Sequence, residues 1–394
     1  MRILATSLHT VDLPLLAPTM WVGGVNTAWT RTILRVQTDE GLEGIAETDG
    51  SPATRLWLRM LQQQFEGTDP FQWRQVLGRF AHVGGPTGLA WRHASQAFET
   101  ACWDLMAKAL DRPLHQMLGG AMRGTVPSIA YVMYQPDSGR SARVQTAEQV
   151  VEHTAELVDE FGFETIKLKG GVHQPEKELE AAQKLRKAFS SRQLRFDPNG
   201  LWSVETAVRL GHRFEPLDLE WYEDPCVGVE GMSRARASVR IPFATNMCCM
   251  SLEQLPTAIR AGAFDVQLLD VDDWGGLTAL MKAAVTCEAF QLGIGIHSSG
   301  ESGIGTALNL HIAASLTTFP HAMDSFYHMQ AMDVITEEHT IKDGSFSVPT
   351  GPGLGVTIDE DRLKYLEEAH ARHTHQTTGV EWDNRAVQRV PGMW

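Results

Sequence analysis

The sequence predicts an α/β fold in which a small N-terminal α+β domain precedes a parallel (β/α) barrel. Three observations favour this fold. Residues 1–50 alternate apolar and polar side chains as strands do, residues 51–120 change to a helical period, and the remainder alternates short apolar runs with amphipathic helices. Because parallel barrels consist of repeated βα units, we expect functional side chains at the carboxyl ends of the barrel strands.

The α+β domain is expected at residues 1–124, the barrel at 125–350 and a C-terminal segment at 351–394. "TRTILRVQTDEGLEGIAET" predicts a hairpin that turns near Glu40 and Gly41. "ASQAFETACWDLMAKALDRPLHQMLGG" predicts helices that stop at Gly119 and Gly120. Its apolar side chains lie near one helical stripe, at Ala97, Ala101, Leu105 and Leu110.

The barrel is expected to contain eight strands. The candidates are "VPSIAYVMY", "ETIKLKGG", "QLRFDPNG", "LEWYEDP", "IPFATN", "FDVQLLDVDD", "LGIGIHSSG" and "HAMDS". Each of these apolar runs ends in polar residues, and helical segments separate them. This order favours parallel strands connected by helices.

Composition excludes several classes of partner. Acidic side chains outnumber basic ones, 48 to 34, so the net charge of −14 argues against nucleic acid. No apolar run is long enough to span a membrane, and the N-terminus lacks the apolar core of a leader peptide. The cysteines are odd in number, form no CxxC pair and predict reduced thiols in the cytoplasm: Cys102, Cys226, Cys248, Cys249 and Cys287.

Polar residues recur once per βα unit at the ends of six successive predicted strands. They are Lys169, Asp197, Glu223, Asn246, Asp270 and His297, and neighbouring members are 23 to 28 residues apart. Lys167 shares the strand face of Lys169, because strand side chains alternate. An exposed antiparallel edge would explain two lysines alone, but it would not explain this recurrence. We therefore expect both lysines inside the barrel mouth.

Three of these residues form a candidate metal site. Asp197, Glu223 and Asn246 follow successive strands and offer oxygen ligands without Cys or His, which favours a hard cation such as Mg²⁺. Taken alone, "DPNG" is typical of a turn, and "YEDP" of a helix start with Asp224 as its cap. The expected convergence of three strand ends favours the metal site over both alternatives.

Candidate bases lie on both flanks of this site. Two like charges near a divalent cation would lower the pKa of a lysine, so that Lys169 or Lys167 can act as a base. On the opposite side, Asp270 would orient the imidazole of His297. This arrangement suits removal of the proton α to a metal-bound carboxylate, through an ene-diolate. Loss of a β-hydroxyl would then give dehydration, and reprotonation from the other side would give epimerisation.

The motifs resemble the enolase superfamily over nearly the whole chain, and within it the glucarate dehydratase-like branch of the mandelate racemase and muconate lactonizing enzyme-type proteins. "AFETACWDLMAKALDRPLHQMLGG" is similar to the last helices of the family's capping domain. "KLKGG", "DPNG", "YEDPC" and "ATNM" follow in the family's order, with asparagine as third ligand as in the glucarate branch. The resemblance implies a modified TIM barrel under an N-terminal α+β capping domain, a C-terminal segment that returns to this domain, and a homo-oligomer.

The resemblance also implies an activity. The chain would be a Mg²⁺-dependent acid-sugar dehydratase, a carbon–oxygen lyase that converts a small carboxylate to a 2-keto-3-deoxy acid. Lys169 would be one general base with Lys167 tuning its pKa, and His297 would be the opposite acid/base, supported by Asp270. The positions that would touch substrate are Asn199, Ser299 and Tyr131.

The chain departs from the family pattern where glucarate dehydratases bind the far end of their substrate. The stretch "WVGGVNTAWTR" lacks the family's histidine, and Asp324-Ser325-Phe326 stands where the family has Asp-Thr-His. The family's C-terminal arginine has no counterpart in register, since Arg385 and Arg389 are displaced. The sequence therefore predicts a substrate with a shorter or less acidic far end than glucarate.

Two alternatives remain open. "HSSGESGIGTALNLHIAAS", with Glu301, is similar to other branches of the superfamily, so an epimerase, racemase or cycloisomerase is one alternative. The other is an inactive metal-binding paralogue, although both bases and all metal ligands are present. The spaced histidines of "HARHTH" (His370, His373 and His375) predict a solvated helix end, and "GPGLGV" predicts a turn.

Overall fold

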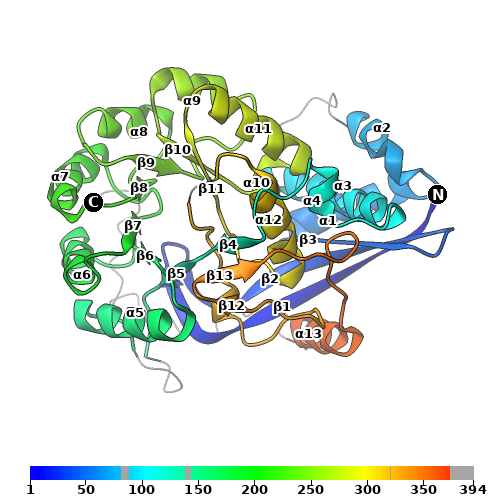
Figure 1. The fold of residues 1–394 in the computed structure, drawn as a ribbon, viewed down its shortest axis with the longest axis horizontal. Helices are drawn as coiled ribbons and strands as arrows, with labels where there is room; N and C mark the ends of the chain where they lie inside the picture. Colours follow the sequence, from blue (N-terminus) through cyan, green and yellow to red (C-terminus); the bar gives the residue numbers. More distant parts are fainter. Residues whose placement is uncertain (81–87, 138–142, 320, 373–394) are drawn as a thin grey trace.

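The computed structural model describes residues 1–80, 88–137, 143–319 and 321–372 (Figure 1). An antiparallel sheet of order β1-β2-β3 opens the chain, followed by helices that pack on it. The hairpin between the second and third strands turns at Gly41, whose φ of +79° suits glycine. The elements are β1 (Ile3–Trp21), β2 (Gly24–Thr38), β3 (Glu43–Asp49), α1 (Pro52–Phe65), η1 (Pro70–Gln72), α2 (Trp73–Gly78), α3 (Leu89–Ala109) and α4 (Leu114–Met117).

The apolar stripe of α3 forms the core of this N-terminal unit. Ala97, Ala101 and Leu105 are fully buried in the apolar cluster shared by α3, α1 and the sheet. The rings of Phe65 and Phe98 stack there, with centroids 4.4 Å apart. Leu110, which we expected on the same stripe, is 53% exposed, because α3 ends at Ala109.

The second unit is a modified (β/α) TIM barrel with seven parallel strands in the order β11-β10-β9-β8-β7-β6-β5. Figure 1 shows these strands as a curled sheet surrounded by helices, with β1–β3 and α1–α4 to one side. The strands are β5 (Ile129–Val132), β6 (Thr165–Lys169), β7 (Gln193–Asp197), β8 (Trp221–Glu223), β9 (Phe243–Thr245), β10 (Val266–Leu269) and β11 (Gly293–Ile296).

The predicted eighth strand is not a regular strand, but it closes the ring. In "HAMDS", Met323 N donates to Pro127 O (2.7 Å) and Asp324 N donates to Ile296 O (3.1 Å). The segment therefore links the end of β11 to residues 127–128, just before β5, through two backbone hydrogen bonds. A small sheet of order β12-β13-β4 lies beside this closure, with β4 (Thr125–Pro127), β12 (Ile341–Lys342) and β13 (Ser345–Ser347).

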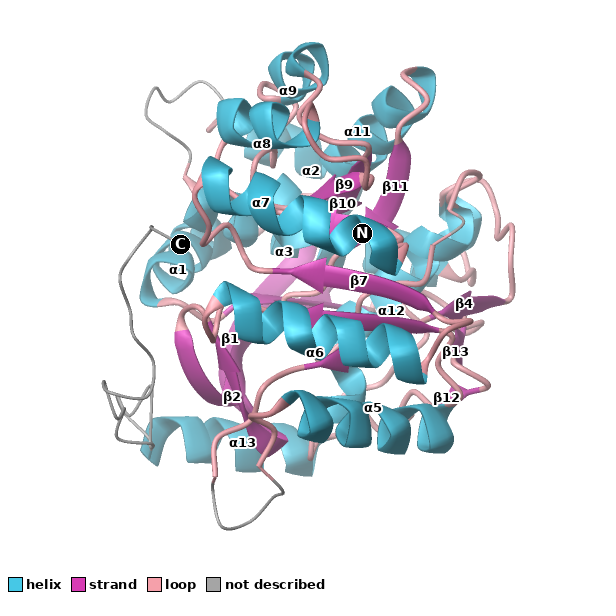
Figure 2. Ribbon diagram, turned by 90° about the vertical axis from the view of Figure 1, so that its left-hand side faces the viewer, coloured by secondary structure: helices cyan, strands magenta, loops and turns pink. Residues whose placement is uncertain are grey.

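Amphipathic helices cover the outside of the barrel. Figure 2 shows α5, α6 and α7 as neighbouring rows outside the strands. Ile166 and Leu168 of β6 point outward into the main apolar cluster, so Lys167 between them points inward. The helices are α5 (Ala147–Phe161), α6 (Pro175–Ala188), α7 (Val204–Phe214), η2 (Glu215–Leu217), α8 (Val229–Arg236), α9 (Leu255–Ala261), α10 (Val271–Trp274), α11 (Leu277–Ala289), α12 (Gly303–Ser315) and η3 (Tyr327–Met329).

The last described helix, α13 (Glu360–Arg372), lies against β1 of the N-terminal unit. Glu367 accepts a hydrogen bond from His9 (3.1 Å), and His370 contacts Asp12 (3.0 Å). The predicted domain boundaries stay predictions. His373, His375, Arg385 and Arg389 lie outside the described residues.

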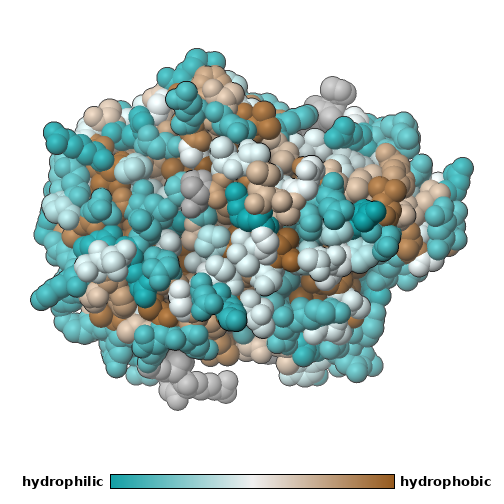
Figure 3. Space-filling view, in the orientation of Figure 1, coloured by the Kyte–Doolittle hydropathy of each residue, from teal (hydrophilic) through white to brown (hydrophobic). Residues whose placement is uncertain are grey.

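The polar surface and the unpaired cysteines agree with what the sequence predicts. Hydrophilic side chains dominate the outline of the molecule in Figure 3. None of the described helices has the length and apolar character needed to cross a membrane. All five cysteines are buried free thiols, as predicted, although their compartment stays a prediction.

Candidate active site

Both lysines of β6 lie inside the barrel, so the exposed-edge alternative is wrong. Lys167 is fully buried, and its Nζ lies 2.6 Å from Glu223 Oε1 and 2.6 Å from Asp324 Oδ2. Lys169 is 6% exposed and donates to Asp197 Oδ2 at 2.6 Å. Strand alternation thus brings two ammonium groups into contact with carboxylates from three other barrel segments.

Contacts with carboxylates raise the pKa of both lysines, and the lowering expected beside a divalent cation stays a prediction. Burial is the largest influence and favours the neutral amine of each lysine. Asp324 and Glu223 nevertheless raise the pKa of Lys167 well above its usual value, and Asp197 raises that of Lys169. Repulsion between the lysines is weaker than these direct contacts with carboxylates. Both lysines are therefore charged in this arrangement.

The acidic residues at the ends of β7 and β8 fit a hard cation. Burial raises the pKa of Glu223 to about 7; Lys167 opposes this, and Asp197 and Asp324 reinforce it. The lysines lower the pKa of Asp197 to about 2 in spite of its burial. The carboxylates of Asp197 and Glu223 lie at neighbouring strand ends, and negative neighbours help to raise the pKa of Glu223. Such a cluster of oxygen donors is a suitable environment for Mg²⁺. Asp197, Glu223 and Asn246 are the residues that would hold it.

Asn246 is placed by Asp224, a residue whose role the sequence did not reveal. The Asp224 carboxylate accepts hydrogen bonds from Thr245 Oγ1 (2.5 Å), Asn246 N (2.8 Å) and Met247 N (3.2 Å). The alternative that Asp224 caps a helix is wrong, because α8 begins only at Val229. In the described part of the chain, no group of three or more His, Cys, Asp or Glu side chains could hold a metal, and the third ligand of the predicted site is the amide of Asn246.

The opposite flank contains the predicted His–Asp pair. His297 Nδ1 lies 3.0 Å from Asp270 Oδ2, and Ser299 Oγ donates to the same oxygen at 2.7 Å. Asp270 Oδ1 accepts the backbone N–H groups of Asp272 and Asp273. Burial lowers the pKa of His297, but Asp270 outweighs it and raises the pKa to about 9. His297 is therefore charged at neutral pH, with Nδ1–H donated to Asp270.

The three predicted substrate contacts have different surroundings. Ser299 directs its hydroxyl to Asp270, which makes it a residue that positions the His–Asp pair. Asn199 donates its backbone N–H to Asp197 Oδ1 at 2.7 Å, and its side-chain amide is directed to Met247 Sδ, 3.7 Å away. Tyr131 is buried, and its ring centroid lies 5.0 Å from Lys167 Nζ. Contact of these residues with substrate stays a prediction.

Two further buried residues belong to the interior of the barrel. Arg195 donates to Asp324 Oδ1 (3.1 Å) and to Glu220 Oε2 (2.6 Å), and its guanidinium stacks on Trp221 at 3.6 Å. Asp324 thus bridges Lys167 and Arg195. The sequence feature that could have identified Arg195 is its position two residues before Asp197, which places both side chains on the same strand face.

The capping hairpin is anchored beside the His297 flank. Arg31 of β2 donates to Asp272 Oδ2 (2.7 Å) and to Glu47 Oε1 (3.1 Å), and all three side chains are buried. Glu47 in turn accepts the backbone N–H of Ser302, just before α12. These contacts fix the N-terminal unit on the loops that follow β10 and β11.

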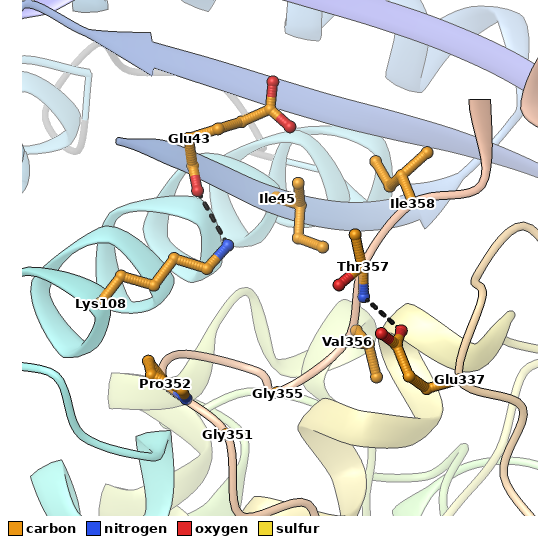
Figure 4. Close-up of a pocket in the computed structure, with 10 residues that line it drawn as sticks. All are labelled: Glu43, Ile45, Lys108, Glu337, Gly351, Pro352, Gly355, Val356, Thr357 and Ile358. Carbon is orange, nitrogen blue, oxygen red and sulfur yellow. Dashed lines mark hydrogen bonds between the residues drawn. The ribbon is translucent and has the colours of Figure 1, made fainter. Parts of the chain in front are cut away.

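A separate groove lies away from this site, between β3, α3 and residues 351–358 (Figure 4). Its charged groups bind their own neighbours: Lys108 Nζ donates to Glu43 O and Asp104 Oδ2, and Glu337 accepts Thr357 N. The "GPGLGV" segment forms turns there, as predicted, with Gly353 and Gly355 at positive φ. The groove lacks the opposed acids and bases of the barrel mouth.

Comparison with known proteins agrees with this geometry. The family model described as "Enolase C-terminal domain-like" matches residues 149–362, and "Mandelate racemase / muconate lactonizing enzyme, N-terminal domain" matches residues 6–119. A probable glucarate dehydratase of Streptomyces coelicolor is 34% identical over 379 residues, covering 89% of this chain and 87% of that protein.

Two other relatives show the range of the similarity. A chloromuconate cycloisomerase of Pseudomonas putida is 30% identical over 284 residues, covering 70% of this chain and 73% of that protein. The crystal structure of an enolase from Thermobispora bispora, complexed with magnesium and formate, superposes with a TM-score of 0.90. It is 35% identical, and the match covers 96% of this chain and 95% of that chain.

Proposed function

Because the chain belongs to the enolase superfamily, with both domains of the mandelate racemase and muconate lactonizing enzyme type, we propose that it is a Mg²⁺-dependent acid-sugar dehydratase. The observation that carries this proposal is the opposition of two proton-transfer groups across one set of oxygen donors. Lys169 contacts Asp197 on one flank, and His297 is held by Asp270 on the other. Cytoplasmic location and homo-oligomerisation stay predictions.

The proposed reaction removes the proton α to a carboxylate and expels a β-hydroxyl. When bound, Mg²⁺ would supply Lewis-acid stabilisation of the negative charge that develops on the substrate carboxylate. Lys169 Nζ accepts the α-proton as a neutral amine, so its contact with Asp197 must first break and its extra proton must pass to solvent. Lys167 stays charged between Glu223 and Asp324 and adds positive potential beside the carboxylate.

His297 supplies the second proton transfer. It is charged at neutral pH, and Asp270 holds Nδ1, so Nε2–H is the donor left for the departing hydroxyl. The C–H bond and the C–O bond break, water leaves, and the enol product becomes a 2-keto-3-deoxy acid. Lys169 and His297 on opposite faces of a substrate would also suit an epimerase or a cycloisomerase. Similarity to the chloromuconate cycloisomerase supports this second candidate function.

Proton NMR of the protein with Mg²⁺ tests the proposal. Aldonic and aldaric acids would be incubated singly in deuterated buffer, with and without chelator. We expect chelator-sensitive formation of a 2-keto-3-deoxy product from at least one of them. Exchange of the α-proton without elimination would support the epimerase, and a new lactone signal from a muconate would support the cycloisomerase. The inactive paralogue would give neither exchange nor product from any of these acids.

A further inference from the structure

Three aromatic side chains from distant parts of the chain form a continuous wall at the barrel mouth. Tyr131 of β5 stacks on Phe326, which follows the segment that closes the barrel, with centroids 4.1 Å apart. Phe326 in turn packs on Trp29 of β2, at 5.1 Å. We call Tyr131, Phe326 and Trp29 the aromatic wall. It joins the capping hairpin to the segment that closes the barrel.

The aromatic wall begins at the reacting groups. The Tyr131 ring lies 5.0 Å from Lys167 Nζ, and Phe326 is two residues after Asp324, which binds that lysine. At its other end, Trp29 covers Gly300, three residues after His297; a Cβ on Gly300 would approach the indole to 2.6 Å. The wall therefore spans the distance between the lysine flank and the histidine flank.

The surroundings of the wall are apolar. Tyr131 and Phe326 belong to a buried cluster, against which Trp29 packs, together with Ile129, Met133, Ala322, Met329, Leu15 and Trp21. The cationic side chains described near the mouth each contact buried carboxylates: Lys167, Lys169, Arg195 and Arg31. Among these described groups, only Nη2 of Arg195, whose guanidinium is stacked on Trp221, is buried without a partner. A second carboxylate on the substrate would lose its hydration here and gain no free cation, which is unfavourable.

One polar group in the wall lacks a partner. The indole Nε1–H of Trp29 is buried without a hydrogen bond in the described part of the protein. A buried donor of this kind is costly unless an acceptor reaches it. A hydrocarbon far end would leave it unpaired, whereas one hydroxyl oxygen would satisfy it.

We propose that the aromatic wall receives the far end of the substrate and selects an acid sugar that ends in an uncharged hydroxyl group, so that aldonates are preferred over aldarates. The C–H faces of the sugar chain pack on the rings, and the terminal hydroxyl accepts the Trp29 N–H. This inference rests on the proposed dehydratase function and names its substrate class.

Paired substrates test the inference. Turnover of gluconate and galactonate would be compared with that of glucarate and galactarate, which differ only at the far end. We expect kcat/KM at least about tenfold higher for the aldonate of each pair, because burying the unpaired carboxylate is unfavourable. Faster Mg²⁺-dependent dehydration of the aldarates would overturn the inference and leave the proposed function standing. Failure to dehydrate any of the four would overturn both.

Variants of the wall sharpen the test. Trp29→Phe keeps the ring and removes the donor, and we expect kcat/KM for the aldonate to fall about fivefold to tenfold, chiefly through KM. Phe326→His places a polar group in the wall, and the aldonate-to-aldarate ratio should fall by about tenfold. Trp57→Phe is the matched control, because Trp57 packs on Trp91 in the N-terminal core, and it should leave the ratio unchanged. Equal ratios in all three variants would contradict the role of the wall.

Discussion

The two sides of the barrel mouth are built from opposite kinds of side chain. Along β6 to β8, Lys167, Lys169, Asp197 and Glu223 are buried and pair charge with charge. Along β5 and the closing segment, Tyr131, Phe326 and Trp29 present rings. The difference teaches that, under the proposed function, the lysine–carboxylate pairs and the far-end contacts lie on different segments, so substitutions can perturb them separately.

The charged side should be the more sensitive to substitution. Lys167→Gln would leave Glu223 and Asp324 buried without their shared cation, and we expect the free energy of unfolding to fall by about 3–5 kcal/mol. Urea denaturation measures it. Lys184→Gln is the control, because Lys184 binds Glu148 and Glu180 at the surface and should leave the free energy of unfolding nearly unchanged. Equal losses in the two variants would remove the contrast between the buried and the exposed pairs.

Asp224 tests whether the candidate metal site depends on the loop behind it. Asp224→Ala removes the acceptor for Thr245, Asn246 and Met247, and we expect Mg²⁺ affinity to fall about 10- to 100-fold. Calorimetric titration with Mg²⁺ measures this affinity. Asp218→Asn, on an exposed residue after η2, should leave it unchanged. An unaltered Mg²⁺ affinity in Asp224→Ala would show that Asn246 needs no such support.

Asp270→Asn should change the pH dependence of the reaction. The pKa of His297 is raised to about 9 by Asp270, so the acid form persists at neutral pH and is lost as pH rises through that value. Without the charge on Asp270, burial lowers the pKa of His297, and the alkaline limb of kcat should move to lower pH. A pH profile from 5 to 10 tests this, and an unmoved limb would assign it to another group.

Ser299→Ala is expected to have the smallest effect. The variant removes one hydrogen bond to Asp270, so kcat should fall about fivefold to tenfold while KM stays constant. A rise in KM with constant kcat would instead restore the original prediction that Ser299 touches substrate.

Much of the fold and part of the site were predictable because they depend on local periodicity. Alternation along β6 placed both lysines inside, and the regular spacing of polar strand ends brought His297 and Asp270 together. Strand count was less certain at "HAMDS", where closure requires only two backbone hydrogen bonds. Leu110 was misplaced because the exact end of a helix is weakly encoded.

The partners of the buried charges were not predictable in the same way. Asp324 meets Lys167 across 157 residues of sequence, and Trp29 reaches Phe326 only when the hairpin packs on the barrel. Lysine–lysine repulsion was visible in the sequence, whereas the direct contact of Lys169 with Asp197, which raises the pKa of Lys169, was not. Such effects depend on tertiary contacts that no local pattern reports.

Deuterium exchange at the α-carbon most directly tests the proposed roles of Lys169 as base and His297 as acid. The unreacted aldonate would be followed by proton NMR in deuterated buffer with Lys169→Gln and with His297→Asn. The account predicts that His297→Asn exchanges the α-proton but forms no 2-keto-3-deoxy acid, because the base remains and the acid is gone. It predicts that Lys169→Gln does neither. Exchange that persists in Lys169→Gln and disappears in His297→Asn would contradict the assignment of Lys169 as the base.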